Sequence, residues 1–486
     1  MYIVCGLITP RMILSMFGST YNGVVSSATQ FLSMISILTL GIAGATRVEL
    51  YKSIAAEDIL QTSRIMKATN RYMRKVAFGV VVYAAVLIFV YPYISTNDLT
   101  AAECRILIAI VSIGTFVQYF CGISYATLLK ANQQEYIYAF TQTVATIINT
   151  IAVACLIKLG FSIYTVKLAT SVVFALSPIV MSIYVHRKFH LISNCEADET
   201  ALKNRGAVAF HSIANIVHDN TDLLILTFFT DAKVISVYTV YYLVIGKIKN
   251  IMQAFTNGLE AAFGNMWARG EQSSIQRNFQ IYEFAIFAFV SVVFSCIGLL
   301  IVPFVSIYTR GVTDVNYTRY GLAVLIALAE GMFCIRNPYL ILVQATGSYQ
   351  QTKNGAMWEA ALNIVSSLVF VQLFGINGVI IGTLLANIFR TTQYAWYISK
   401  HILNRSLFVV VRRFGWLILN VACIVLPVQF MTGGIIVHSW IGWVGNAFLI
   451  FVFAVFVTCA SAFLFYRSEM LGMLGFIQKA VRRRKK

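Results

Sequence analysis

The chain has 486 residues, of which 59% are hydrophobic and 12% are charged, and its mean hydropathy is +0.76. Long apolar runs recur throughout, which excludes a soluble globular protein and predicts an all-α polytopic membrane protein. The formal net charge of +18 is the charge that basic loops between membrane helices produce, so we expect no nucleic-acid partner.

Apolar segments long enough to cross a bilayer as helices follow one another from the start of the chain, and we expect no cleavable signal peptide. The fourteen predicted spans cover residues 1–17, 23–46, 76–94, 104–129, 136–157, 163–185, 207–229, 236–262, 283–306, 319–344, 354–374, 378–399, 414–432 and 441–465. Most Lys and Arg residues of the loops fall on one side, which the positive-inside rule assigns to the cytoplasm. Both termini are therefore predicted to be cytoplasmic.

The loop 47–75 on that inner side is predicted to contain a surface helix. Glu57 and Asp58 suit its start, because negative charge is favourable at a helix N-terminus. The basic residues that follow recur on one face as a stripe suited to anionic lipid headgroups, or alternatively to a partner enzyme. They are Arg64, Lys67, Arg71 and Arg74. The basic tail 482–486 is interpreted in the same way.

A weak internal duplication relates the two halves of the chain. A constant offset of 214 residues aligns Tyr125 with Tyr339 and Asn149 with Asn363, and it maps spans 1–6 onto spans 7–12. Parallel repeats of this kind form the halves of transporters. We therefore predict an N-terminal lobe over 1–186 whose first helix is shortened at its start, a C-terminal lobe over 187–400, and two further helices with a basic tail over 401–486.

The segment 236–262 carries charge where a membrane helix normally has none. Lys247 and Lys249 lie near its middle, and on a helical wheel they share one half of the circumference with Asn250 and Asn257. A charge deep in hydrocarbon costs several kcal/mol, so such a face lines a wet cavity. The alternative is that the two lysines extend to one interface. We expect this helix to form one wall of a cationic cavity.

Further charged groups inside the predicted spans extend the candidate site. Arg336 and Arg390 are interpreted as cavity residues, with an internal ion pair as the alternative for Arg390. Arg11 and Arg47 lie in or at the end of the first two spans, where interfacial anchoring is the competing interpretation. A second set would suit ion coupling: His218 and Asp222, one helical turn apart, and Glu330.

Motifs for chemistry are missing from the sequence. The nine cysteines form no CxxC and no Cys/His ligand spacing, so we expect neither a disulfide framework nor a metal site. A phosphate-binding loop, a GxGxxG and an HExxH are also absent. No cofactor is expected, and we do not expect an enzyme.

Several stretches carry a resemblance to a known family. They are residues 10–23 (PRMILSMFGSTYNG), 50–52 (LYK), 67–71 (KATNR), 220–226 (NTDLLIL) and 237–238 (VY). This pattern resembles polysaccharide-unit flippases, of the O-antigen or capsule type, in the multidrug/oligosaccharidyl-lipid/polysaccharide exporter superfamily.

The resemblance implies two six-helix lobes around a central cavity, with two C-terminal helices appended. It also implies alternating access that carries a polyprenyl-pyrophosphate-linked oligosaccharide across the bacterial cytoplasmic membrane. Polysaccharide polymerases and glycosyltransferases would be partners, together with membrane lipids. The basic residues of the spans suit that substrate, because a pyrophosphate needs a cationic, wet path past hydrocarbon.

Two other functions compete with this prediction. A multidrug or small-solute antiporter would share the fold, but it would favour acidic and aromatic cavity groups over the basic excess present here. A membrane-embedded glycan polymerase or ligase would be expected to carry a large outer loop, and the longest predicted outer loop has about a dozen residues.

Overall fold

The protein is described by a computed structural model of the 486-residue chain. The residues that the structure describes are 2–39, 42–95, 98–189, 191–192, 195–198, 220–256, 259–432, 437 and 439–484. Two compact units divide them: unit 1 comprises Met1–Thr239 with Gly311–Val315, and unit 2 comprises Val240–Arg310 with Asn316–Lys486.

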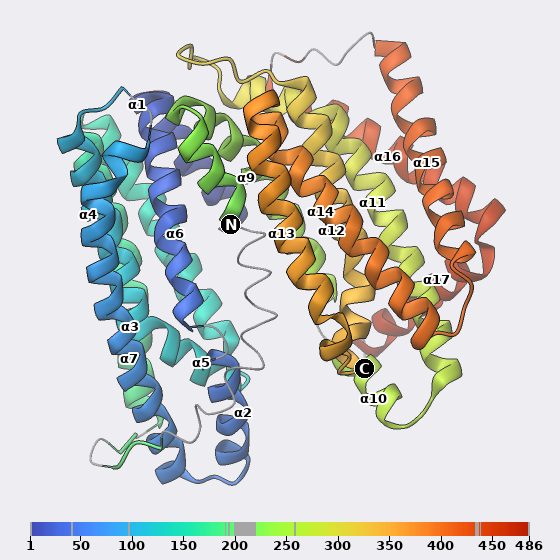
Figure 1. Cartoon of the computed structure of the whole chain (residues 1–486), viewed down its shortest axis with the longest axis horizontal. Coiled ribbons are helices and arrows are strands. Elements are labelled where there is room, and N and C mark those ends of the chain that lie inside the picture. The colour runs from blue at the N-terminus through green and yellow to red at the C-terminus, as the bar shows by residue number, and fades with distance from the viewer. Residues whose placement is uncertain are drawn as a thin grey trace. The chain divides into compact units, whose positions relative to one another are not determined.

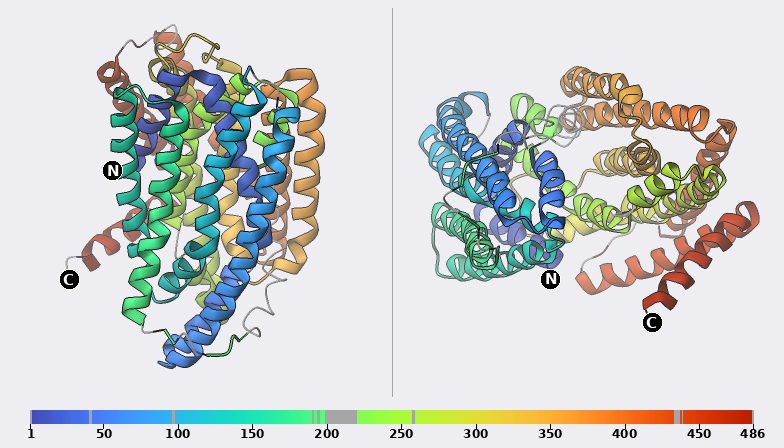
Figure 2. Two further views of the ribbon diagram at one scale, coloured as in Figure 1. Left: turned by 90° about the vertical axis from the view of Figure 1, so that its left-hand side faces the viewer. Right: turned by 90° about the horizontal axis from the view of Figure 1, so that it is seen from below.

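Unit 1 is a bundle of helices that run side by side (Figure 1; Figure 2, left). Its helices are α1 (Tyr2–Ser33), α2 (Ile42–Ala55), α3 (Ile59–Ile94), α4 (Ala101–Val117), α5 (Ile123–Ala131), α6 (Glu135–Lys158), α7 (Ile163–Phe189) and a short helix at Asn220–Phe229. A single π-helical turn, Gln118–Gly122, joins α4 to α5. Helix α9 (Ala232–Thr256) begins in this unit and continues into unit 2.

Unit 2 is built around α11, which packs against α10, α12, α15, α16 and α17 (Figure 1). Its helices are α10 (Leu259–Ala268), α11 (Gln272–Tyr308), α12 (Tyr320–Ala345), α13 (Tyr349–Phe374), α14 (Ile376–His401), α15 (Phe408–Thr432), α16 (Trp440–Phe465) and α17 (Arg467–Arg484). In its most apolar stretch α11 is 67% buried, against 28% for α3. A helix that is apolar all round needs such surroundings, and α11 has them.

The prediction of an all-helical polytopic membrane fold is confirmed. Each predicted span overlaps a helix, although only residues 220–229 of the span 207–229 are among those described. Within the described part of the chain, nine helices are long and apolar enough to cross a membrane.

Some boundaries differ from the predicted ones. Spans 1–17 and 23–46 meet in α1, which breaks at Gly18, where φ is 83°. Asp58 caps the predicted inner helix by accepting a hydrogen bond from the Gln61 amide at 2.8 Å. That helix is not separate, because it continues into span 76–94 as α3. The segment 236–262 is not one helix, because α9 ends at Thr256 and α10 begins at Leu259.

The offset of 214 residues also relates helix ends. It separates the ends of α3 and α11 at Ile94 and Tyr308, and the ends of α5 and α12 at Ala131 and Ala345. The aligned Asn149 and Asn363 are both buried, and in each the Oδ1 atom has no hydrogen-bond partner. The lobe boundaries at 186/187 and 400/401 stay predictions.

Candidate functional site

The charged residue at the centre of the candidate site is Lys249 on α9. Its side chain is buried in unit 2, and Nζ lies 3.0 Å from Glu330 Oε2 on α12. Nζ also donates a hydrogen bond to the Tyr242 hydroxyl, two turns earlier on α9, at 3.2 Å. The helix thus holds a cation inside the protein with a carboxylate and a hydroxyl as its partners.

Phe333 lies between two cations of this site. Its ring centroid is 4.0 Å from Lys249 Nζ and 4.5 Å from the guanidinium carbon of Arg336. The negative face of an aromatic ring stabilises a desolvated cation. Phe333 therefore connects the Lys249–Glu330 pair to the next ion pair along α12.

Glu359 on α13 is shared by two arginines. Arg336 on α12 pairs with its Oε1 atom, and Arg390 on α14 places Nε 3.2 Å from its Oε2 atom. Arg390 also donates hydrogen bonds to the Thr352 carbonyl at 3.0 Å and to the Tyr394 hydroxyl at 2.5 Å. The predicted alternative of an internal ion pair is the one in which the structure places Arg390.

These five residues form what we call the charged network. Its members, each less than a tenth exposed, are Lys249, Glu330, Arg336, Glu359 and Arg390. Three cations face two carboxylates, so the network has an excess of buried positive charge. Buried charge is tolerated only when it is paired, and an excess cation gives an anionic ligand a favourable place to bind.

A second buried cluster in unit 2 has a different composition. Glu283 on α11 receives Arg405 Nη1 at 2.8 Å, Arg413 Nε at 2.7 Å and the Tyr339 hydroxyl at 2.6 Å. It joins α11, α12, α15 and the segment before α15, so its geometry is that of a structural connection between helices.

The other predicted site residues lie apart from the charged network or outside the described residues. Lys247 is half-buried and Asn250 is exposed, both on α9. Arg11 on α1 and Arg47 on α2 belong to unit 1, and each is partly buried. The Nε atom of Arg47 is buried without a hydrogen-bond partner.

The predicted ion-coupling residues are also separated. Asp222 is buried in unit 1 and accepts a hydrogen bond from the Tyr238 hydroxyl at 3.1 Å. Glu330 belongs to the charged network. His218 and Asn257 lie outside the described residues.

Two carboxylates of these clusters, Glu359 and Glu283, are absent from the site predicted from sequence. Each is a single carboxylate in or at the start of a predicted span, and that rarity is the only signal the sequence offers. Their partners come from other helices, so the pairing cannot be read from helical spacing. Glu330 and Arg336 share α12, and the structure gives these two residues different partners.

The internal duplication shows that the fold alone does not require the charged network. At the five positions 214 residues earlier, the N-terminal repeat has only uncharged side chains or none: Ile35, Phe116, Gly122, Ala145 and Leu176. One repeat therefore folds without these charges, and the other carries them at their desolvation cost. This asymmetry favours a role in function.

An apolar groove lies on the other side of α9. It has a volume of about 480 Å³ and is lined by α9, α11 and α16, with Val244 and Ile248 contributed by α9. Every lining residue is apolar, aromatic or cysteine, so the groove suits a hydrocarbon chain. Among the described residues, no three His, Cys, Asp or Glu side chains lie together as a metal site would require.

The fold resembles those of solved membrane transporters. No protein-family model and no curated protein sequence matches the chain. A structure of the lipid II flippase MurJ in an inward closed conformation matches with a TM-score of 0.71 and 13% identity, covering 96% of this chain and 98% of that one.

Multidrug transporters show the same architecture. An inward-facing multidrug resistance MATE family transporter of the MOP superfamily matches with a TM-score of 0.58 and 13% identity, over 82% of this chain and 95% of that one. The Vibrio cholerae MATE transporter VcmN in its bent form matches with 0.52 and 15%, over 83% and 94%. At these identities the likeness establishes the fold, which is that of polytopic membrane transporters.

Proposed function

We propose that this protein is a flippase that moves polyprenyl-pyrophosphate-linked oligosaccharide units across the bacterial cytoplasmic membrane for surface polysaccharide assembly. The observation that carries the proposal is the pair of surfaces on α9. One side of the helix places Lys249 in the charged network, and the other side contributes Val244 and Ile248 to the apolar groove.

A lipid-linked oligosaccharide needs both kinds of surface. Its pyrophosphate is multiply charged and loses hydration in the membrane unless cations and hydrogen-bond donors replace water. Its polyprenyl chain is best kept in hydrocarbon or against apolar side chains. A single helix that separates these environments suits a substrate with a charged head and an apolar tail.

In this mechanism the arginines and the lysine of the charged network exchange partners. Glu330 and Glu359 hold Lys249, Arg336 and Arg390 while the site is empty. The pyrophosphate then competes with these carboxylates for the same cations, which lowers the cost of binding because the cations are already dehydrated and positioned. Bidentate guanidinium groups suit this exchange because their geometry matches phosphate oxygens.

The remaining predicted residues take secondary roles. Lys247, Asn250 and Asn257 extend the polar side of α9, and Arg11 and Arg47 supply positive charge from the first lobe. Asp222, with His218 one turn away, is the candidate for ion coupling, together with Glu330. Transport would proceed by alternating access, with both termini in the cytoplasm and with polymerase and glycosyltransferase partners at the membrane.

A multidrug or other small-solute antiporter is the second candidate, favoured by the likeness to MATE transporters. Its cationic substrates would use Glu330 or Glu359 as counter-ions. Both carboxylates already pair with cations within unit 2, and the network has an excess of positive charge. This charge balance favours the anionic substrate. A membrane-embedded glycan polymerase or ligase is not supported, because the structures matched are transporters.

A binding experiment on the groove tests the role of the tail. We expect Ala447→Trp, which fills the groove lined by Ala447 of α16, to weaken binding of a long-chain polyprenyl-pyrophosphate oligosaccharide and to leave a short-chain analogue unaffected. Val452→Trp is the matched control, because Val452 is exposed on the same helix outside the groove. Equal affinity of both variants for the long-chain substrate would contradict the proposed role of the groove.

A further inference from the structure

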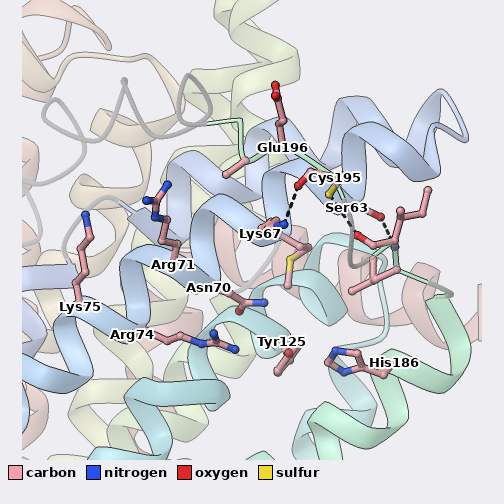
Figure 3. Close-up of a pocket in the computed structure, with 14 residues that line it drawn as sticks. Ser63, Lys67, Asn70, Arg71, Arg74, Lys75, Tyr125, His186, Cys195 and Glu196 are labelled. Carbon is pink, nitrogen blue, oxygen red and sulfur yellow. Dashed lines mark hydrogen bonds between the residues drawn. The ribbon is translucent and has the colours of Figure 1, made fainter.

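A second polar hollow lies at one end of unit 1, apart from the charged network. It has a volume of about 870 Å³ and is enclosed by α3, α5, α7 and the segment 191–197 (Figure 3). One face of α3 supplies its cations, Lys67, Arg71, Arg74 and Lys75. The only carboxylate among the described lining residues is Glu196, so the lining is strongly positive.

The segment after α7 is bonded to α3 and forms one wall of the hollow. The Ile192 amide donates to Ser63 Oγ at 3.0 Å, and Lys67 Nζ donates to the Cys195 carbonyl at 2.8 Å. Gln61 Nε2 donates to Asp198 Oδ2 at 2.7 Å. These bonds hold the wall in place beside the basic face instead of over it.

The side chains inside the hollow suit a ligand with both charge and hydroxyl groups. Figure 3 shows Arg74 directed toward Tyr125 and His186, with Glu196 pointing to the opposite side. The Asn70 Oδ1 atom is buried and has no hydrogen-bond partner, so it can accept a hydrogen bond from a hydroxyl group. His186 has its Nδ1 atom 2.8 Å from the Ser182 carbonyl, so Nδ1 carries the proton and Nε2 faces other partners.

The duplication again shows which charges the fold requires. On α11 the residues 214 positions after Lys67, Asn70, Arg71, Arg74 and Lys75 are all apolar or aromatic: Ile281, Phe284, Ala285, Ala288 and Phe289. In unit 2, α17 packs against α11. The basic face of α3 is therefore a feature of unit 1 alone.

We propose that this hollow binds a phosphate ester that carries a hydroxyl group, either as a lipid headgroup or as a free molecule. The phosphate would lie against Arg74 and the other α3 cations, since charge-assisted hydrogen bonds from guanidinium and ammonium groups are the strong ones. The hydroxyl would donate to Asn70 Oδ1. The site is independent of the transport pathway proposed above and would give the N-terminal lobe its own anionic ligand.

Binding to the purified full-length protein tests the proposal. One arm counts phosphatidylglycerol and phosphatidylcholine molecules retained per protein by native mass spectrometry. The other arm measures binding of sn-glycerol 1-phosphate by calorimetry. We expect Arg74→Gln to weaken the binding that occurs by about tenfold, the effect of one charge-assisted hydrogen bond. Asn70→Leu should weaken binding of these hydroxyl-bearing ligands as well.

Arg187→Gln is the matched control, because Arg187 is exposed on α7 next to His186 and does not line the hollow. Selective retention of phosphatidylglycerol that Arg74→Gln abolishes would identify a lipid headgroup as the ligand. Binding of glycerol phosphate with the same sensitivity would identify a free phosphate ester. If neither probe binds selectively, or if Arg187→Gln weakens binding as much as Arg74→Gln, the proposal is overturned.

Discussion

Lys249 Nζ lies 3.0 Å from Glu330 Oε2, and both side chains are almost fully buried, at 8% and 3% exposure. A pair in such a place contributes little net stability, because desolvation of the two charges offsets their attraction. The pair also has no charged equivalent in the N-terminal repeat, where Ile35 and Phe116 stand at the matching positions. These two facts together favour a functional reason for the pair.

Removing only one partner of this pair should destabilise the protein strongly. We expect Lys249→Met to cost about 3–5 kcal/mol, because Glu330 is left as an uncompensated buried charge. The double variant Lys249→Met/Glu330→Leu should recover most of that loss. Thermal unfolding in detergent measures both. A double variant as unstable as the single one would contradict the ion-pair assignment.

The Glu283 cluster should behave as a structural element. We expect Glu283→Gln to cost about 3–5 kcal/mol, because Arg405 and Arg413 lose the carboxylate that neutralises them. Glu49→Gln is the control, since its pair with Lys52 is largely exposed, and exposed pairs contribute about 0–1 kcal/mol. Unfolding curves that coincide for the two variants would refute this difference.

Close packing at Gly23 should not tolerate a side chain. A Cβ atom at Gly23 would lie 1.8 Å from the Ala232 carbonyl oxygen, so α1 and the start of α9 would have to separate. We expect Gly23→Ala to destabilise unit 1 by about 1–3 kcal/mol. Gly298→Ala in α11 meets no atom within 4 Å and should stabilise by about 0.5–1 kcal/mol. Limited proteolysis of the two variants distinguishes these outcomes.

The break in α1 depends on Asp314. Its carboxylate accepts hydrogen bonds from the Ser19 amide at 2.7 Å and the Ser19 hydroxyl at 2.6 Å, just after Gly18 adopts a positive φ. This arrangement caps the second part of α1, so Asp314→Ala should cost about 0.5–2 kcal/mol. Asp314→Asn, which keeps an acceptor, should cost less in the same thermal assay. An equal loss in both variants would show that capping is not the cause.

Much of the fold could be predicted from the sequence, because membrane spans depend on local composition. The long apolar runs located most helices, and Asp58 marked the start of α3 through the local chemistry of a helix N-terminus. Helix α17 was not predicted, because its many basic residues interrupt any apolar run and its stability comes from packing on α11 and α16. Local pattern carries no information on such packing.

The charged network was only half accessible from sequence. Buried cations in spans pointed to Lys249, Arg336 and Arg390, because charge in hydrocarbon is costly wherever the helix lies. Their partners depend on which helices meet, so the role of Glu359 on α13 could not be derived from spacing along α12 or α14. The helical wheel also grouped Asn250 with Lys249, whereas one is exposed and the other buried.

The most direct test of the proposed function is transbilayer movement of substrate. The protein would be reconstituted in liposomes with a labelled polyprenyl-pyrophosphate oligosaccharide, and exposure of the label to an impermeant probe would be followed over time. We predict faster movement with the wild-type protein, and loss of that movement in the stable double variant Lys249→Met/Glu330→Leu. No movement with the wild type, together with proton-driven export of a cationic dye, would contradict the flippase proposal and support the antiporter.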